Sequence, residues 1–437
     1  MRTMHHTPDL APVDQPGPGE NAVRAITVEL AARVTEHLAT HPNHAADTES
    51  VTHLVDQLME ERARTALVQG TRVTVDEPRL RRLVLDHVLG LGPIEELLVE
   101  PGVQNIHITG SEEVVLDFGG GHKEHRPAVA ASDDELVALV QWAAARAPGG
   151  ERRFDVAAPI LSMELPGGER LSAVMPGVAA RPTLTIRRHP ARYLRLRDLA
   201  RSGMIDQTAQ ELLRAAVGAR LNVLISGATN SGKTTLLRAL LGALEGERLV
   251  TVEDAFELGL HRLPDTDLDV QALQGRPANV EGIGDISVAE LVRAALRMCP
   301  DRVIVGETRG AETIALLNAM SMGTDGSMST IHASSSRQVF AKLAAYCAQS
   351  PERLTASATA SLVGAALHLV VHIDTSHAGE RYVASVREVV GAEGEQVISN
   401  ELYLRTSHTC SGELVCAPSG VVADRLHRAG YTFRGWV

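Results

Sequence analysis

Apolar side chains recur every three or four positions through residues 21–90, which is the spacing of helices that bury one face. One run contains Val23, Ile26, Leu30 and Val34, and a second contains Val51, Leu54 and Leu58. A third run, Leu80–Leu89, stops at Gly90, a residue type that commonly ends helices. We therefore expect a helical N-terminal extension over residues 21–90. Residues 1–20 hold several prolines and no apolar core, and are expected to form a disordered tail.

Short strand-like runs replace the helical period over residues 91–188. The runs are Gln104–Thr109, Glu113–Phe118, Glu169–Met175 and Thr183–Arg187. Glycine-rich turns such as Gly119–Gly121 separate them, and one helix is expected near Asp134–Ala145. This pattern predicts a small α+β domain over residues 91–188. The arginine- and leucine-rich stretch 189–205 is expected to be a linker.

From residue 206 onward, short apolar strands alternate with helical stretches. The strands are Leu221–Ile225, Leu249–Val252, Val303–Val305 and Met328–Ile331. Such alternation is typical of a mostly parallel sheet covered by helices. Three more strand-like stretches follow, at Leu367–Ile373, Tyr382–Val389 and Gln396–Leu404. We expect residues 206–437 to form one α/β domain.

The composition excludes several classes of protein. The net charge is 42 − 54 = −12 and aromatic residues make up 3% of the chain, which argues against a general nucleic-acid binder. The four cysteines show no C-x-x-C spacing, so a zinc ribbon is not supported. No apolar run reaches the length of a membrane span. We expect a cytoplasmic protein that contacts a membrane only through a partner.

The segment Gly227–Thr234, read GATNSGKT, fits the phosphate-loop pattern G-x-x-x-x-G-K-[ST]. A strand enters it and an apolar helix leaves it, so backbone N–H groups and a helix N-terminus would converge on phosphate oxygens. Lys233 would reach the β- and γ-phosphates, and Thr234 would offer a hydroxyl to Mg²⁺. The alternative to a phosphate-binding loop is a glycine-rich turn that binds no ligand. The residues expected around the phosphates are Gly227, Ala228, Thr229, Asn230, Ser231, Gly232, Lys233, Thr234 and Thr235.

Carboxylates follow two of the expected strands. Glu307 ends one strand, directly after Gly306, where many P-loop ATPases carry an aspartate. Glu253 and Asp254 end another, and the carboxyl ends of parallel strands meet at one edge of a sheet. Glu307, Thr234 and Asp254 are candidate oxygen ligands for Mg²⁺. Either Glu307 or Glu253 could polarise the attacking water, whereas a solvated turn is the alternative for the Glu253 cluster.

One histidine and several arginines complete the candidate set. His332 ends the strand Met328–Ile331, where a neutral imidazole could contact the γ-phosphate or the water, although a lone histidine is more often structural. Ser287 is expected to begin a helix that runs to about Met298. Arg293 and Arg297 would share a face of it, and Arg309 follows Glu307. These arginines would sense phosphates in trans or hold the carboxylates; otherwise they are surface charges.

Four segments together resemble the secretion and pilus traffic ATPases, most closely the CpaF type of the Tad pilus system. The phosphate loop is similar to that family's Walker A motif. The other three are the "Asp box" Val252–Asp254, the Walker B segment Arg302–Gly310 and the "His box" Gly326–Ala333. Gly90–Ile94, Arg276–Gly282 and Leu291–Arg297 match as well, so the resemblance spans residues 80–399. Asn230 and Thr308 depart from the pattern, where CpaF proteins often have Gly and Val.

The resemblance implies a RecA-like ATPase domain behind a smaller N-terminal domain, in a homohexameric ring. It implies Mg-ATP as substrate, with the N-domain arginines Arg170 and Arg187 on its phosphates. It also implies an inner-membrane platform protein as partner, with recruitment to the inner face of the plasma membrane. The expected function is a motor for pilus assembly or type II-like secretion. A type IV secretion or conjugation ATPase and a non-hydrolysing, nucleotide-gated scaffold are the alternatives; a P-loop kinase is disfavoured because no acceptor lid is evident.

Overall fold

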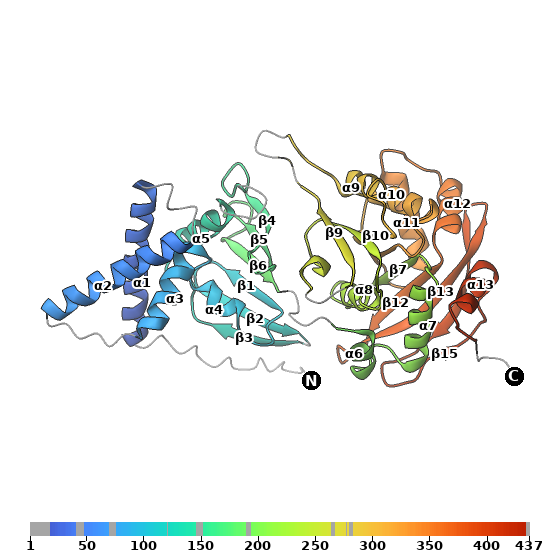
Figure 1. The fold of residues 1–437 in the computed structure, drawn as a ribbon, viewed down its shortest axis with the longest axis horizontal. Coiled ribbons are helices and arrows are strands. Elements are labelled where there is room, and N and C mark those ends of the chain that lie inside the picture. The colour runs from blue at the N-terminus through green and yellow to red at the C-terminus, as the bar shows by residue number, and fades with distance from the viewer. Residues whose placement is uncertain are drawn as a thin grey trace, which may run out of the picture. The chain divides into compact units, whose positions relative to one another are not determined.

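The computed structural model describes residues 18–40, 48–69, 76–119, 121–145, 152–188, 194–263, 267–276, 278 and 283–433. The chain divides into two compact units, Met1–His189 and Pro190–Val437 (Figure 1). Most of the expected tail, residues 1–17, lies outside the described residues. Its last part does not fit the expectation, because helix α1 (Pro18–Thr40) already begins at Pro18. Proline suits a first helical position, where its missing N–H has no intrahelical partner to lose.

The N-terminal helices of the first unit bury a core of their own. Helices α1, α2 (Thr48–Gln69) and α3 (Glu77–Leu89) pack around residues that include Leu30, Val34, Val51 and Val84. Asp76 caps α3 by accepting from Arg79 N over 3.3 Å. The helical period in the sequence therefore predicted these elements correctly.

A six-stranded antiparallel sheet forms the rest of the first unit, in the order β3-β2-β1-β6-β5-β4. Its strands are β1 (Asn105–Thr109), β2 (Glu113–Gly119), β3 (His122–Arg126), β4 (Ile160–Glu164), β5 (Arg170–Val174) and β6 (Thr183–Arg187). Alternate residues such as Ile106, Leu171 and Leu184 face a core shared with α4 (Ile94–Leu98) and α5 (Asp133–Ala145). The sequence analysis missed both edge strands, β3 and β4. β3 reads HKEHR, so no apolar alternation marks it.

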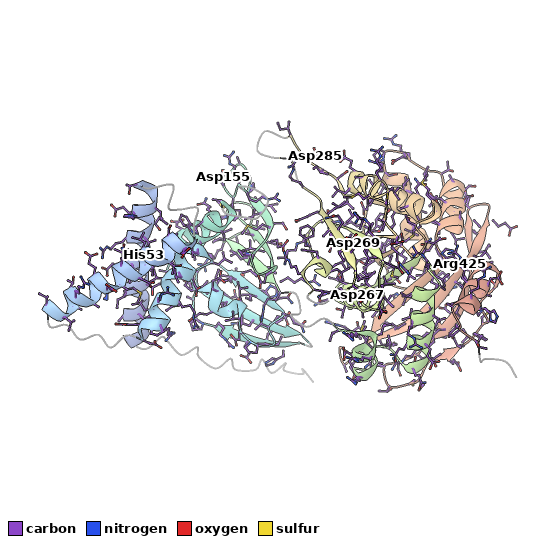
Figure 2. All side chains as sticks on the ribbon, in the orientation of Figure 1. His53, Asp155, Asp267, Asp269, Asp285 and Arg425 are labelled. Atoms are coloured by element: carbon purple, nitrogen blue, oxygen red, sulfur yellow. The ribbon has the colours of Figure 1, made fainter. Side chains whose placement is uncertain are left out.

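A nine-stranded sheet organises the second unit, in the order β15-β14-β13-β12-β7-β11-β10-β8-β9. The six strands from β12 to β9 run parallel, and β13–β15 continue the sheet antiparallel. The parallel strands are β7 (Val223–Gly227), β8 (Arg248–Glu253), β9 (Asp269–Gln274), β10 (Arg302–Thr308), β11 (Met328–His332) and β12 (Leu369–Thr375). The antiparallel ones are β13 (Arg381–Glu393), β14 (Gln396–Leu404) and β15 (Glu413–Leu414). Asp269, labelled in Figure 2, begins the edge strand β9.

Helices cover both faces of this sheet, which is why its central strands are buried on both sides. In β7, Val223 and Ile225 belong to one apolar cluster and Leu224 to the other. The helices are α6 (Leu196–Arg201), α7 (Gln207–Gly218), α8 (Lys233–Leu241), α9 (Val288–Ala295), α10 (Glu312–Ser321), α11 (Gln338–Gln349), α12 (Ala356–Ala366) and α13 (Gly420–Arg428), with a 3₁₀ turn at Leu260–Arg262. The predicted mostly parallel α/β sheet is confirmed, and the domain has a RecA-like fold.

Two expectations about the second unit were wrong in detail: the extent of the linker before it and the end of one helix. Residues 189–205 were expected to be a linker, yet Leu196 and Leu199 of α6 are buried in the core of the second unit. The helix that Ser287 caps ends at Ala295 rather than near Met298. Arg297 therefore lies beyond α9 and does not share a helical face with Arg293.

Candidate active site

The candidate residues of the second unit stand at the carboxyl ends of neighbouring parallel strands. β7 leads into the phosphate loop, β8 ends at Glu253, and β11 ends at His332. Glu307 is the penultimate residue of β10. In the register of β7 and β11, His332 lies opposite Gly227, the first residue of the loop. The order of the strands thus gathers four motifs, distant in sequence, at one edge of the sheet.

The phosphate loop turns through two left-handed backbone positions before α8 begins at Lys233. Gly232 has φ 94° and Asn230 has φ 64°. Asparagine adopts this region more readily than most side chains do. Asn230 therefore suits the left-handed position that the loop requires.

Lys233 is folded over the loop that it follows. Its side chain is buried, and Nζ donates to the carbonyl of Ala228 over 2.7 Å and to that of Gly227 over 3.3 Å. Nζ also lies 3.2 Å from Nδ1 of His332. The ammonium group of Lys233 thus connects the loop on β7 to the end of β11.

His332 continues this connection to Glu307. Its Nε2 lies 2.7 Å from Oε1 of Glu307. Because an ammonium group can only donate, Nδ1 of His332 must accept from Lys233, and Nε2 then carries the proton donated to Glu307. Burial, followed by the charge of Lys233, lowers the pKa of His332 below its ordinary value. A neutral imidazole with its proton on Nε2 is the form that fits both contacts.

Glu253 is buried beside the same edge, with 3% of its surface exposed. Its Oε2 accepts from the backbone N–H groups of Glu257 and Leu258, each over 2.8 Å. A Cβ on Gly306 would lie 3.0 Å from Cγ of Glu253 and 3.4 Å from its Oε2. The side chain of Glu253 therefore uses the space beside β10 that Gly306 leaves open.

Asp254 and Arg309 form an ion pair between the ends of β8 and β10, with both side chains substantially exposed. Of the two roles expected for Arg309, this contact favours that of holding a carboxylate. It also makes Asp254 a less suitable magnesium ligand than the sequence suggested, because its charge is matched by Arg309. Arg293 is exposed on α9 and Arg297 is exposed beyond it.

The remaining candidates, Arg170 and Arg187, belong to the first unit. They lie directly opposite one another on β5 and β6. Arg187 is exposed, whereas Arg170 is half-buried.

The side chains at the sheet edge suit a Mg²⁺ ion whose ligands come partly from phosphates and water, rather than one held entirely by protein oxygens. Among the residues that the structure describes, no group of three or more His, Cys, Asp and Glu side chains is placed to hold a metal. Thr234 is half-buried as the second residue of α8, and the side chain of Glu307 is 35% exposed. Mg²⁺ keeps several waters and needs only one or two protein oxygens when phosphates complete its shell. Thr234 and Glu307 are two candidate oxygens of that kind at this edge.

Hydroxyl groups that the sequence analysis overlooked fix the strands beneath these residues. Thr330 Oγ1 donates to the carbonyl of Gly306 over 2.8 Å, and Thr308 Oγ1 lies 2.7 Å from Oγ of Ser329. Both contacts join β10 to β11 next to Glu307. The available signal was the presence of hydroxyl residues at 327, 329 and 330, in a stretch expected to be a buried strand. Buried hydroxyl groups almost always have a hydrogen-bond partner, so their presence there indicates such contacts.

The family model for type II/IV secretion system proteins matches residues 89–409. The chain belongs to this family. A putative conjugal transfer protein of Mycobacterium tuberculosis H37Rv is 38% identical over 321 residues, which cover 72% of this chain and 88% of the relative. VirB11 of Rhizobium radiobacter is 32% identical over 295 residues, covering 61% and 81%. The traffic-ATPase family expected from the four motifs is thereby confirmed.

Solved structures of similar proteins include a VirB11 ATPase and a pilus retraction motor. The VirB11 ATPase of the Brucella suis type IV secretion system, in complex with sulphate, is 26% identical, with 68% of this chain and 95% of that chain covered and a TM-score of 0.36. The pilus retraction motor PilT with bound ADP is 18% identical, with 67% and 80% covered and a TM-score of 0.48. Among the residues that the structure describes, no helix of this chain is long and apolar enough to cross a bilayer.

Proposed function

We propose that this protein binds Mg-ATP at the edge formed by β7, β8, β10 and β11, and hydrolyses its γ-phosphate to drive traffic through a cell-envelope machine. The observation that carries the proposal is the continuous contact from Lys233 through His332 to Glu307. It joins the loop that would hold phosphates to a carboxylate that would act on water.

Each residue would have a defined part in this reaction. The loop amides and the N-terminus of α8 would hold the phosphates, and Lys233 would exchange its contacts with Ala228 and Gly227 for β- and γ-phosphate oxygens. Mg²⁺, held by Thr234 and Glu307, would neutralise developing charge on the phosphate oxygens. His332 would hold Glu307 through Nε2.

Between the two carboxylates left open by the sequence, we favour Glu307 as the group that positions the water. Oε2 of Glu253 is engaged by two backbone N–H groups, and the side chain is almost fully buried. Glu307 is more exposed and receives a ring N–H from His332. Glu253 would then support the strand ends. Glu307→Gln should abolish hydrolysis and retain ATP binding, whereas Glu253→Gln should lower hydrolysis less.

Phosphate release from Mg-ATP, measured against protein concentration with Lys233→Ala as the inactive control, tests the proposal. We further propose a hexameric ring in which Arg170 and Arg187 contact phosphates. Its two functional domains would be residues 91–188 and the second unit, in which α6 packs on the core of the nine-stranded sheet. A shared site would make activity per subunit rise with concentration. A wild-type protein that binds ATP without hydrolysing it would instead support a nucleotide-gated scaffold.

The cargo has two candidates. The CpaF-like motifs favour pilus assembly through an inner-membrane platform protein. The names of the conjugal transfer relatives, one of them 38% identical, favour a conjugation or type IV secretion machine. Replacing the native gene with a Lys233→Ala allele and scoring both surface pili and DNA transfer would separate them, because only the dependent process should stop.

A further inference from the structure

Two side chains from distant parts of the chain cover the last glycine of the phosphate loop. A Cβ on Gly232 would lie 3.1 Å from Cε of Met204 and 3.6 Å from Cδ of Arg381. Both side chains are therefore in contact range of the backbone that turns into α8. Met204 is buried, whereas Arg381 is half-buried.

The segment that carries Met204 is fixed in place by residues late in the chain. Val383 N donates to the carbonyl of Met204 over 2.8 Å. Arg405 Nη1 donates to the carbonyl of Gly203 over 2.9 Å, and Gly412 N donates to Asp206 Oδ2 over 2.6 Å. Residues 203–206, which form the wall beside Gly232, are thus held by three hydrogen bonds from the later part of the chain.

Arg381 reaches the loop from the first residue of β13. Its backbone pairs with Thr375 on β12, and Ile373 on β12 pairs with Gly227 at the start of the loop. Because Cδ is bonded directly to Nε of the guanidinium group, that group also lies near Gly232. Within the described part of the chain, that group makes no hydrogen bond or ion pair. By contrast, Arg309 and Lys233, also at this sheet edge, are both engaged.

A half-buried cation beside an anion cradle, with no carboxylate of the described residues paired to it, fits a phosphate ligand. Guanidinium groups bind phosphate oxygens in a planar fork, which an ammonium group cannot reproduce. Loop amides such as that of Gly232 surround the α- and β-phosphates, whereas the γ-phosphate lies toward the lysine. We propose that Arg381 binds the α- and β-phosphates of the nucleotide and thereby sets nucleotide affinity. This inference rests on the proposed function.

Equilibrium binding of fluorescent ADP and of a non-hydrolysable fluorescent ATP analogue to the full chain tests the inference. Arg381→Gln should weaken both nucleotides by a similar factor, about tenfold. Arg381→Lys should fall between that variant and wild type, because it keeps the charge and loses the fork. Arg428→Gln, the same change at an exposed arginine in α13, should bind as wild type does. Thermal unfolding of each variant verifies that it is folded.

The possible outcomes are distinct. Affinities of Arg381→Gln within twofold of wild type for both nucleotides would overturn the inference while leaving the proposed function intact. A loss confined to the ATP analogue would also overturn it, because Arg381 would then act on the γ-phosphate. A wild-type protein that binds neither nucleotide would remove the proposed function itself.

Discussion

Nε2 of His332 lies 2.7 Å from Oε1 of Glu307, and this contact joins the ends of β11 and β10. The same imidazole accepts from Lys233 through Nδ1. A change at the phosphate loop can therefore alter the orientation of Glu307 through a single ring. In this arrangement His332 is a positioning residue for the carboxylate.

Replacing His332 should reduce turnover more than nucleotide binding. We expect His332→Ala to lower kcat for ATP hydrolysis by about tenfold to a hundredfold, with a smaller change in KM. His332→Gln should recover part of the loss, because its amide can donate to Glu307. Steady-state kinetics of the two variants would measure this, and equal losses in both would argue against a positioning role.

Gly306→Ala should disturb the site through Glu253. The added Cβ would lie 3.0 Å from Cγ of Glu253, which is closer than ordinary contacts allow. We expect a loss of stability of about 1–3 kcal/mol together with reduced hydrolysis. Gly391→Ala on β13 is the matched control, because a Cβ there meets nothing within 4 Å. Urea unfolding and phosphate release would be compared for both, and indistinguishable variants would contradict the steric explanation.

Arg302 is expected to be a large contributor to stability because it is wholly buried and its donors are satisfied. Nη2 donates to Glu247 Oε1 over 2.8 Å and to the carbonyl of Val217 over 3.1 Å, while Nη1 donates to the carbonyl of Gly326 over 3.3 Å. Arg302→Met should cost about 1–3 kcal/mol, because the buried carbonyls of Val217 and Gly326 lose their donor. Glu247 keeps its ion pair with Arg220 in this variant. In urea unfolding, Glu247→Gln should cost less in this variant than in wild type, because the ion pair with Arg302 is already lost. A double variant as unstable as the sum of both single variants would show that the pair is not coupled.

His368 should make stability depend on pH in the acid range. Its Nδ1 accepts from Asn222 N over 3.0 Å, and burial lowers its pKa to about 4. The unfolded chain binds this proton near pH 6.5, so folded-state stability is retained above that pH and lost as pH falls toward 4. We expect the free energy of unfolding to drop by about 1–2 kcal/mol between pH 7 and pH 5 from this group. In His368→Gln, urea unfolding should show a correspondingly smaller drop.

Parts of the fold and of the site could be predicted from local sequence, whereas others depend on which strands become neighbours in the sheet. The phosphate loop was predictable because its pattern sits between an apolar strand and an apolar helix, and β14 matches the predicted Gln396–Leu404. The contacts among Lys233, His332 and Glu307 were not, since they depend on β7, β11 and β10 being neighbours. Arg381 gave no signal, because a single arginine after a turn resembles any surface charge.

The anchoring of Asp206 by Gly412 also sets an order of events during synthesis. These partners are 206 positions apart, and the phosphate loop lies between them in sequence. A ribosome therefore completes the loop long before it makes the residues that support one wall of it. The nascent domain should acquire full nucleotide affinity only after its last strands have emerged and docked, so a partly synthesised chain should bind nucleotide weakly.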